Sequence, residues 1–295
     1  MHILLVHNSD AGDGHYDAAS LLSLIRAQGH QVEYVEATDD WKPLTQSRVE
    51  LVVAAGGDGT VEDVARHLAG SGIPIGVLPL GTANNVASAL GISETPIPEL
   101  VAGWVGADRW PFDTGLATIE GRAMRFVESV GVGLLTETFR RITRGSAGYV
   151  DRLADANERM DAAIEVLRET LRHLEPTSVE LTIDGRPLSG EYLLLEVMNF
   201  GCAGPSLCLV PDAAQADGLF DVVLADVGHR ERLIADLPLY QRRNDSLAPP
   251  RLPAYRGRHV ILRSESLQLH FDDQLLRCRG PVELTIEPQA LTFIV

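Results

Sequence analysis

The fold of this chain is decided by the stretch Leu51-Val52-Val53-Ala54-Ala55-Gly56-Gly57-Asp58-Gly59-Thr60. Its first five residues form an unbroken apolar run, which is typical of a strand buried in a parallel sheet. A helical pattern follows the glycines, with apolar residues at Val61, Val64, Ala65 and Leu68. We expect Thr60 to cap this helix, because Asp63 follows three residues later in the manner of a capping box.

A glycine-rich turn between a strand and a helix lets backbone N–H groups approach a phosphate closely. The helix dipole adds about 0.3–1 kcal/mol in favour of an anion at the same point. The turn therefore predicts a phosphate site, and a plain connecting turn is the alternative.

A second turn of the same kind follows along the chain, Pro79-Leu80-Gly81-Thr82-Ala83-Asn84-Asn85. It lies between an apolar strand, residues 73–78, and a helical pattern that Gly91 is placed to end. Two strand–glycine–helix turns in one sheet bring both helix N-termini to the carboxyl edge of the strands, where open α/β sheets bind ligands. Ordinary helix capping is the alternative role for Asn84 and Asn85.

The pattern of elements changes near residue 115. Before it, strands and helices alternate, which predicts parallel pairing with right-handed crossovers. After it come short strand-like runs with a hairpin signal at Asp184-Gly185, interrupted by a helix over residues 149–174 whose apolar stripe we expect to face the core. The sequence thus predicts an α/β protein with a parallel, Rossmann-like N-terminal domain, residues 1–115, and a mostly antiparallel β-sandwich C-terminal domain, residues 116–286.

Composition agrees with two soluble domains. The chain has 295 residues, 45% of them hydrophobic, and that length exceeds the usual size of a single core. No stretch reaches the ~18–20 apolar residues of a membrane span, and the N-terminus has the pattern of a strand instead of a signal peptide. The three cysteines show no metal-ligand spacing, and we expect all three to be reduced, buried thiols in a cytoplasmic protein: Cys202, Cys208 and Cys278.

The net charge of the chain argues against several kinds of binding partner. A net charge of −16 argues against nucleic acid and against non-specific adhesion to anionic lipid. Lys42 is the only lysine, so the chain lacks the lysine of a Walker-type P-loop. Two groups of arginines are candidate membrane-facing patches, with ordinary surface ion pairs as the alternative: Arg140, Arg141, Arg144 and Arg152, then Arg242, Arg243, Arg251, Arg256 and Arg258. The proline-rich segment 245–254 is expected to be an exposed loop.

Several motifs in sequence order make the chain resemble the diacylglycerol kinase-type lipid kinases, in the superfamily that also holds sphingosine and NAD kinases. Besides the two glycine turns they are His7-Asn8-Ser9-Asp10-Ala11-Gly12, Phe112-Asp113-Thr114-Gly115, Val130-Gly131-Val132-Gly133, Asn199 and the segment 211–219. Together they span nearly the whole chain. The resemblance also implies that the last strand, within residues 287–295, returns to the first domain.

The resemblance implies an ATP- and Mg²⁺-dependent phosphoryl transfer, which needs a phosphate cradle, a cation and a group that receives the proton. The implied nucleotide contacts are Asn8, Thr38, Gly56, Gly57, Asp58, Gly59, Thr60, Glu62, Gly81, Thr82 and Asn84. The implied metal ligands are the Asp217 carboxylate and the backbone carbonyls of Ala214 and Leu219, an oxygen set that suits Mg²⁺. From the residues alone, a turn before a strand is an equal interpretation of Asp217-Gly218.

The chain departs from the family at the expected general base. Bacterial relatives carry Asp-Gly-Glu near the end of the second domain, whereas this chain has Asp272-Asp273-Gln274, which places Gln274 at the glutamate position. An amide has no useful basicity at neutral pH. Three explanations stay open: Asp272 or Asp273 supplies the carboxylate, Asp58 is the base as in the sphingosine kinase branch, or the protein no longer turns over.

We therefore expect a kinase that phosphorylates a hydroxyl of a diacylglycerol-like or related lipid. The alternatives are a catalytically silent nucleotide- or lipid-binding relative and an NAD kinase, which fits segment 211–219 less well. The expected partner is a lipid at a membrane surface, contacted peripherally from the cytoplasm, with no nucleic acid; a homodimer is left open.

Overall fold

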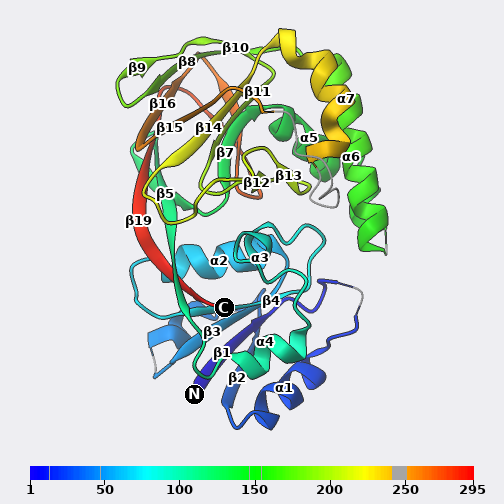
Figure 1. The fold of residues 1–295 in the computed structure, drawn as a ribbon, viewed down its shortest axis with the longest axis vertical. Helices are drawn as coiled ribbons and strands as arrows, with labels where there is room; N and C mark the ends of the chain where they lie inside the picture. The colour runs from blue at the N-terminus through cyan, green and yellow to red at the C-terminus, as the bar shows by residue number, and fades with distance from the viewer. Residues whose placement is uncertain (13, 47, 146, 154, 241–250) are drawn as a thin grey trace. The chain divides into compact units, whose positions relative to one another are not determined.

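The computed structural model describes residues 1–12, 14–46, 48–145, 147–153, 155–240 and 251–295. It divides the chain into two compact units, Met1–Phe112 with Gln289–Val295, and Asp113–Pro288. Strands β5 (Arg109–Ile119) and β19 (Val282–Ile294) contribute residues to both units (Figure 1). The sequence placed the corresponding boundaries after residue 115 and before residue 287.

The first unit is built on a parallel sheet in the order β4-β3-β1-β2, with Phe293 of β19 beside Ile75 of β4. Every residue of β3 is buried, as expected for a central parallel strand. The strands are β1 (His2–His7), β2 (Gln31–Glu36), β3 (Leu51–Gly56) and β4 (Ile75–Pro79). The helices are α1 (Ala18–Ala27), α2 (Asp58–Leu68), α3 (Asn85–Ala89) and α4 (Ile97–Gly103), with a 3₁₀ turn η1 (Lys42–Gln46).

Helices cover both faces of this parallel sheet. Leu21 of α1 and Val101 of α4 join Leu5 and Val53 in one buried apolar cluster. Figure 1 shows α2 and α3 on the opposite side of the sheet from α1 and α4. This arrangement confirms the predicted parallel α/β domain.

The start of α2 differs from the prediction. The helix begins at Asp58, and Gly57 occupies the N-cap position without any side-chain cap. Thr60 lies inside the first turn, where its hydroxyl packs back toward Gly56; a Cβ at Gly56 would lie 2.4 Å from Thr60 Oγ1. The predicted Thr60 cap is therefore wrong, because tight packing against Gly56 draws Thr60 into the helix.

The second unit is a sandwich of two sheets. One is antiparallel throughout, in the order β15-β14-β11-β7-β17-β18, and the other contains β10-β8-β16-β19 with β5, β6 and β9. Val130 and Leu195 from the first sheet share one buried core with Leu181, Val260 and Leu284 from the second. The predicted β-sandwich is confirmed.

The strands of this unit are mostly short. Asp184 and Gly185, both with positive φ, form the two-residue turn that pairs Ile183 with Arg186, as the sequence predicts. Besides β5 and β19 the strands are β6 (Arg122–Phe126), β7 (Ser129–Gly133), β8 (Thr177–Ile183), β9 (Arg186–Pro187), β10 (Gly190–Tyr192), β11 (Leu194–Met198), β12 (Cys202–Ala203), β13 (Leu207–Cys208), β14 (Phe220–Ala225), β15 (Ala254–Gly257), β16 (His259–Arg263), β17 (Leu267–Phe271) and β18 (Gln274–Cys278).

Three helices lie together beside the six-stranded sheet (Figure 1). They are α5 (Leu134–Arg144), α6 (Ala156–His173) and α7 (Arg230–Tyr240), accompanied by η2 (Val150–Arg152) and η3 (Val227–His229). The helix predicted from residue 149 begins only at Ala156, because the Asp155 carboxylate accepts hydrogen bonds from the N–H groups of Asn157 and Glu158. Its stripe faces the core as predicted, with Ile164, Leu167 and Leu171 buried.

Two cysteines differ from the expectation. Cys202 and Cys208 lie directly opposite each other in the β12–β13 hairpin and form a disulfide, so the prediction of three free thiols is wrong for this pair. Cys278 is free and buried, as expected. Cross-strand register brings the pair together, and a separation of six residues in the sequence does not reveal that register. Residues 245–250 of the proline-rich segment lie outside the described residues, and Ala254 begins β15.

Candidate active site

The two glycine turns of the first unit meet at the carboxyl edge of its sheet. The N–H of Leu80 donates to the carbonyl of Gly56 at 2.9 Å, and the N–H of Asn8 donates to the carbonyl of Ala55 at the same distance. The loop after β1 also comes close, since a Cβ at Gly12 would lie 2.8 Å from the carbonyl oxygen of Leu80. The structure therefore brings together the turns that follow β1, β3 and β4.

Gly57 and Gly81 pack backbone against backbone. A Cβ placed on Gly81 would lie 2.4 Å from Cα of Gly57, and one on Gly57 would lie 3.2 Å from Cα of Gly81. The contact at Gly81 is with main chain, which cannot rotate away as the end of a flexible side chain can. The close approach of the two turns thus requires glycine at position 81 and leaves little space at position 57, and the uncapped N-terminus of α2 lies beside them.

Asp58 links the same two turns. Its Oδ1 accepts a hydrogen bond from the N–H of Val86, at the start of α3, over 3.1 Å. Burial raises the pKa of this carboxyl above its usual value, against the opposing effect of the backbone N–H groups of Asn85, Val86 and Asn84. Asp58 therefore stabilises α3 and is also a carboxylate with increased basicity.

Asn84 fixes the second turn. Its φ of 51° is left-handed, its Oδ1 accepts from the N–H of Gly81 at 3.0 Å, and its Nδ2 donates to the carbonyl of Gly81 at 2.9 Å. The side chain thus holds the shape of the glycine turn. Of the other predicted nucleotide contacts, Thr82 lies in this turn, Thr38 is exposed just after β2, and Glu62 is buried in α2 with its Oε2 3.6 Å from Arg66.

In the second unit, Asp113 and Asn199 hold the predicted metal loop. The Asp113 carboxylate accepts from the N–H of Gly218 at 2.7 Å, and the Asp113 N–H donates to the carbonyl of Gln215 at 2.8 Å. Asn199 donates to the Asp113 carbonyl at 2.6 Å. Both residues are buried. The segment that contains Ala214, Asp217 and Leu219 is therefore fixed by side chains far away in the sequence.

The Asp217 carboxylate is already engaged. Its Oδ1 accepts from the N–H of Leu219 at 3.0 Å, and its Oδ2 forms an ion pair with Arg256. Within the residues that the structure describes, no group of three histidine, cysteine or acidic side chains could hold a metal ion. Mg²⁺ needs open oxygen ligands in near-octahedral geometry, and Oδ2 of Asp217 faces the Arg256 guanidinium, so this carboxylate does not fit a cation in this arrangement.

Asp272 is also engaged, in the turn between β17 and β18. It is buried, and its carboxylate accepts hydrogen bonds from the backbone N–H groups of Val127, Glu128 and Ser129 at 2.9–3.3 Å. Asp273 and Gln274 are exposed. Asp272 thus orders the chain before β7, and the two exposed residues that follow it are a carboxylate, Asp273, and an amide, Gln274.

The predicted metal loop and the predicted base turn lie at the same end of one sheet. Antiparallel pairing places Asp221 opposite Met198, Met198 opposite Ser129, and Val130 opposite Phe271. The Asp217 loop precedes β14 and Asp272 follows β17, with β11 and β7 between them.

A buried polar pair escaped sequence analysis. Glu196 on β11 and His270 on β17 both lie opposite Gly131 of β7, and Nε2 of His270 is 2.9 Å from Oε2 of Glu196. A Cβ at Gly131 would lie 2.1 Å from the Glu196 carboxylate, so the absent side chain makes room for the pair. Burial raises the pKa of Glu196 well above its usual range and lowers that of His270 to about 3. The sequence signal that could have indicated this pair is Gly131, because a glycine inside a strand often marks a place where another group approaches the backbone closely.

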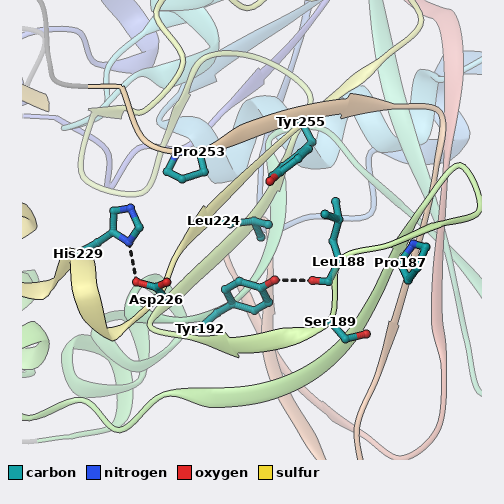
Figure 2. A pocket seen from close by; sticks show the side chains of 9 residues that line it. All are labelled: Pro187, Leu188, Ser189, Tyr192, Leu224, Asp226, His229, Pro253 and Tyr255. Atoms are coloured by element: carbon teal, nitrogen blue, oxygen red, sulfur yellow. Dashed lines mark hydrogen bonds and ion pairs between the residues drawn. The ribbon is translucent and has the colours of Figure 1, made fainter.

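The second unit also contains a cavity of about 610 Å³ at the opposite end of β14 from Asp217 (Figure 2). Figure 2 shows the two tyrosine rings in it and the contact of His229 Nδ1 with Asp226 Oδ1, at 2.7 Å. None of the predicted site residues lines it. The lining residues are Pro187, Leu188, Ser189, Tyr192, Leu224, Asp226, His229, Pro253 and Tyr255.

Comparison with known proteins identifies the family. Residues 2–116 match the diacylglycerol kinase catalytic domain, and residues 141–295 match the YegS C-terminal NAD kinase beta sandwich-like domain. The chain belongs to the diacylglycerol kinase-type lipid kinase family. This confirms the resemblance drawn from the sequence motifs.

Curated members of this lipid kinase family are similar over much of the chain. A diacylglycerol kinase from Bacillus subtilis is 31% identical over 64% of this chain and 59% of its own length, so the match spans less than two thirds of that relative. A diacylglycerol kinase from Mycobacterium tuberculosis is 26% identical over 83% of this chain and 76% of its own length. A solved diacylglycerol kinase structure from Bacillus anthracis has the same fold, with a TM-score of 0.71 and 20% identity over 99% of this chain and 96% of that one.

Several of the candidate membrane-facing arginines are paired with acids. Arg140 and Arg141 both contact Glu137, at 2.6 and 3.3 Å, and Arg251 contacts Asp212 at 2.9 Å. Arg242 and Arg243 lie outside the described residues. The membrane-facing role stays a prediction. No helix in the described part of the chain combines the length and hydropathy needed to cross a membrane.

Proposed function

We propose that this protein transfers the γ-phosphate of ATP to a hydroxyl of a diacylglycerol-like lipid, with Mg²⁺ arriving on the nucleotide. The observation that carries the proposal is the contact of Gly57 with Gly81, which packs two glycine turns together beside the uncapped N-terminus of α2. Backbone N–H groups at such a point bind phosphate without a lysine. The names of the similar kinases support the choice of lipid acceptor.

In this proposal, residues of the first unit bind and orient the nucleotide. The turn Gly56–Thr60 receives the phosphates, Gly81 and Thr82 form the adjacent wall, and Asn84 keeps that wall in shape through its two hydrogen bonds to Gly81. Asn8 and Thr38 follow neighbouring strands of the sheet and contact the rest of the nucleotide. Mg²⁺ supplies neutralisation of the phosphate charge when it is bound.

The proton of the attacking hydroxyl needs an acceptor, and the described carboxylates are unequal candidates. Asp272 is committed to three backbone N–H groups, Asp273 is exposed in the same turn, and Gln274 has no basicity. Asp58 has a raised pKa, which moves its basicity toward the range that suits a general base at neutral pH. We therefore assign to Asp58 the role of general base that accepts this proton, which is one of the three explanations that the sequence left open.

The test is transfer of labelled γ-phosphate from ATP to a panel of lipid alcohols in mixed micelles, with NAD as a further acceptor. Asp58→Asn keeps an oxygen for the Val86 N–H while it removes the basic group, so we expect an intact fold and a loss of ~10²–10⁴-fold in rate. Labelled lipid that Asp58→Asn no longer forms would support the proposal. Labelled NADP instead of lipid would overturn the choice of acceptor.

Gln274 favours a second function, a catalytically silent relative that binds nucleotide or lipid. This candidate predicts measurable ATP binding with no labelled product from any acceptor. Gln274→Glu then separates the two: a silent wild type that gains turnover in this variant places the missing base at residue 274. An active wild type with the Gln274→Glu rate unchanged rejects that position.

A further inference from the structure

Arg256 joins two acids of the second unit that are four residues apart in the sequence. It lies on β15 directly opposite Asp221 of β14, and its guanidinium forms an ion pair with Oδ2 of Asp217. Its Nε is 3.4 Å from Oδ1 of Asp221. One cation thus bridges the loop before β14 and the strand itself.

Asp221 needs such a counter-charge. Its side chain is only 5% exposed, and its Oδ2 has no hydrogen-bond partner. A buried carboxylate without a compensating charge is strongly unfavourable. The half-exposed guanidinium of Arg256 reaches it from the edge strand of the sheet, since β15 is the outermost strand next to β14.

The contacts of the Asp217 carboxylate leave little room for a metal ion. The Leu219 N–H and Arg256 take its two oxygens, and the loop around it is already fixed by Asp113 through Gly218 and Gln215. Mg²⁺ holds its oxygen ligands at about 2.0–2.1 Å and keeps several waters, so at Oδ2 it would compete with the guanidinium and be repelled by its charge.

We propose that Arg256 takes the place of the divalent cation that the family resemblance predicts at Asp217. The guanidinium is a built-in counter-ion that ties the 214–219 loop to β14 and β15. The loop therefore needs no metal for its structure, and any Mg²⁺ that the protein uses enters with the nucleotide. This inference concerns the metal site alone and stands whether or not the lipid kinase activity is found.

The experiment measures Mn²⁺ binding by electron paramagnetic resonance on the nucleotide-free full chain. It compares the wild type with Asp217→Asn, Arg256→Gln and the double variant of both. We expect no Mn²⁺ at Asp217 in the wild type. Arg256→Gln should bind Mn²⁺ at least about ten-fold more tightly, because a positive charge beside the carboxylates is removed, and the double variant should lose that gain.

Two results would overturn the proposal. One is Mn²⁺ bound by the wild type and lost in Asp217→Asn, which would make Asp217 a metal ligand despite Arg256. The other is a folded Arg256→Gln that binds no more Mn²⁺ than the wild type, which would show that the arginine excludes no cation. If Arg256→Gln does not fold, the comparison of the wild type with Asp217→Asn decides.

Discussion

The two units organise their polar residues in opposite ways. At the carboxyl edge of the first unit, glycines let main chain approach main chain, as at Gly57 and Gly81. At the Asp217 end of the second unit, buried side chains reach across the sequence to main chain, as Asp113 does to Gly218 and Asp272 does to Glu128. The first arrangement depends on short segments and the second on long-range packing. We therefore expect substitutions in the first unit to reduce nucleotide binding and phosphoryl transfer, and substitutions in the second unit to reduce the free energy of unfolding.

The largest effect should come from Gly81→Ala. The new Cβ would lie 2.4 Å from Cα of Gly57, so the two turns must separate. We expect phosphoryl transfer to fall by about a hundred-fold, since a displacement of ~1 Å can cost that much in rate, and we expect nucleotide binding to weaken as well. ATP binding by calorimetry measures it. Gly103→Ala is the control, because a Cβ there meets nothing within 4 Å, and an effect of equal size in that variant would contradict the prediction.

Gly131→Ala should act on stability in the second unit. The added Cβ overlaps the buried Glu196 carboxylate, and we expect a loss of about 2–3 kcal/mol in the free energy of unfolding. Denaturant unfolding measures this change. In the double variant with Glu196→Ala the overlap disappears, so the two effects should be non-additive. Additive losses would show that Glu196 and Gly131 do not compete for the same space.

Asp272→Asn should cost about 1–3 kcal/mol, because an amide offers fewer acceptor sites to the N–H groups of Val127, Glu128 and Ser129. The exposed Asp273→Asn is the matched control and should leave the unfolding free energy unchanged. Equal stability of both variants in thermal unfolding would contradict the prediction that Asp272 positions the backbone and Asp273 does not.

The smallest effect is a pH dependence from Glu196 and His270. Their shifted pKa values mean that the folded pair holds one proton, on Glu196, while the unfolded groups titrate at 4.5 and 6.5. Between pH 6.5 and the raised pKa of Glu196, the folded state binds more protons than the unfolded state, so stability falls as pH rises, by up to about 1.4 kcal/mol per pH unit. Below pH 4.5 the unfolded state binds more protons, and stability falls as pH falls.

Glu196→Gln isolates one limb of this profile. It removes the proton that the folded state retains, so the loss of stability above pH 6.5 should disappear for this pair. The variant should instead lose stability below pH 6.5, where only the unfolded histidine takes up a proton. Unfolding free energies across this range measure both limbs, and an alkaline limb that persists in Glu196→Gln would place its origin elsewhere.

The class of both domains, the two glycine turns and the family could be predicted from the amino-acid sequence. These follow from short-range rules: a buried parallel strand is an apolar run, and a turn that touches backbone needs glycine. Gly56–Thr60 and Asp184-Gly185 carry that information within a few residues. The Thr60 cap failed because the hydroxyl packs against Gly56, which capping patterns do not consider.

The contacts of the acidic residues, in contrast, depend on how the chain folds in three dimensions. From the sequence, Asp217 is either a metal ligand or part of a turn, whereas in the structure β15 places Arg256 against it. Asp272 is a candidate base in the sequence, whereas in the structure its carboxylate accepts hydrogen bonds from the backbone before β7. The Cys202–Cys208 disulfide and the Glu196–His270 pair likewise depend on strand register. A carboxylate has the same intrinsic chemistry at any position. Its role is therefore set by burial and by the partners that folding brings within hydrogen-bond distance.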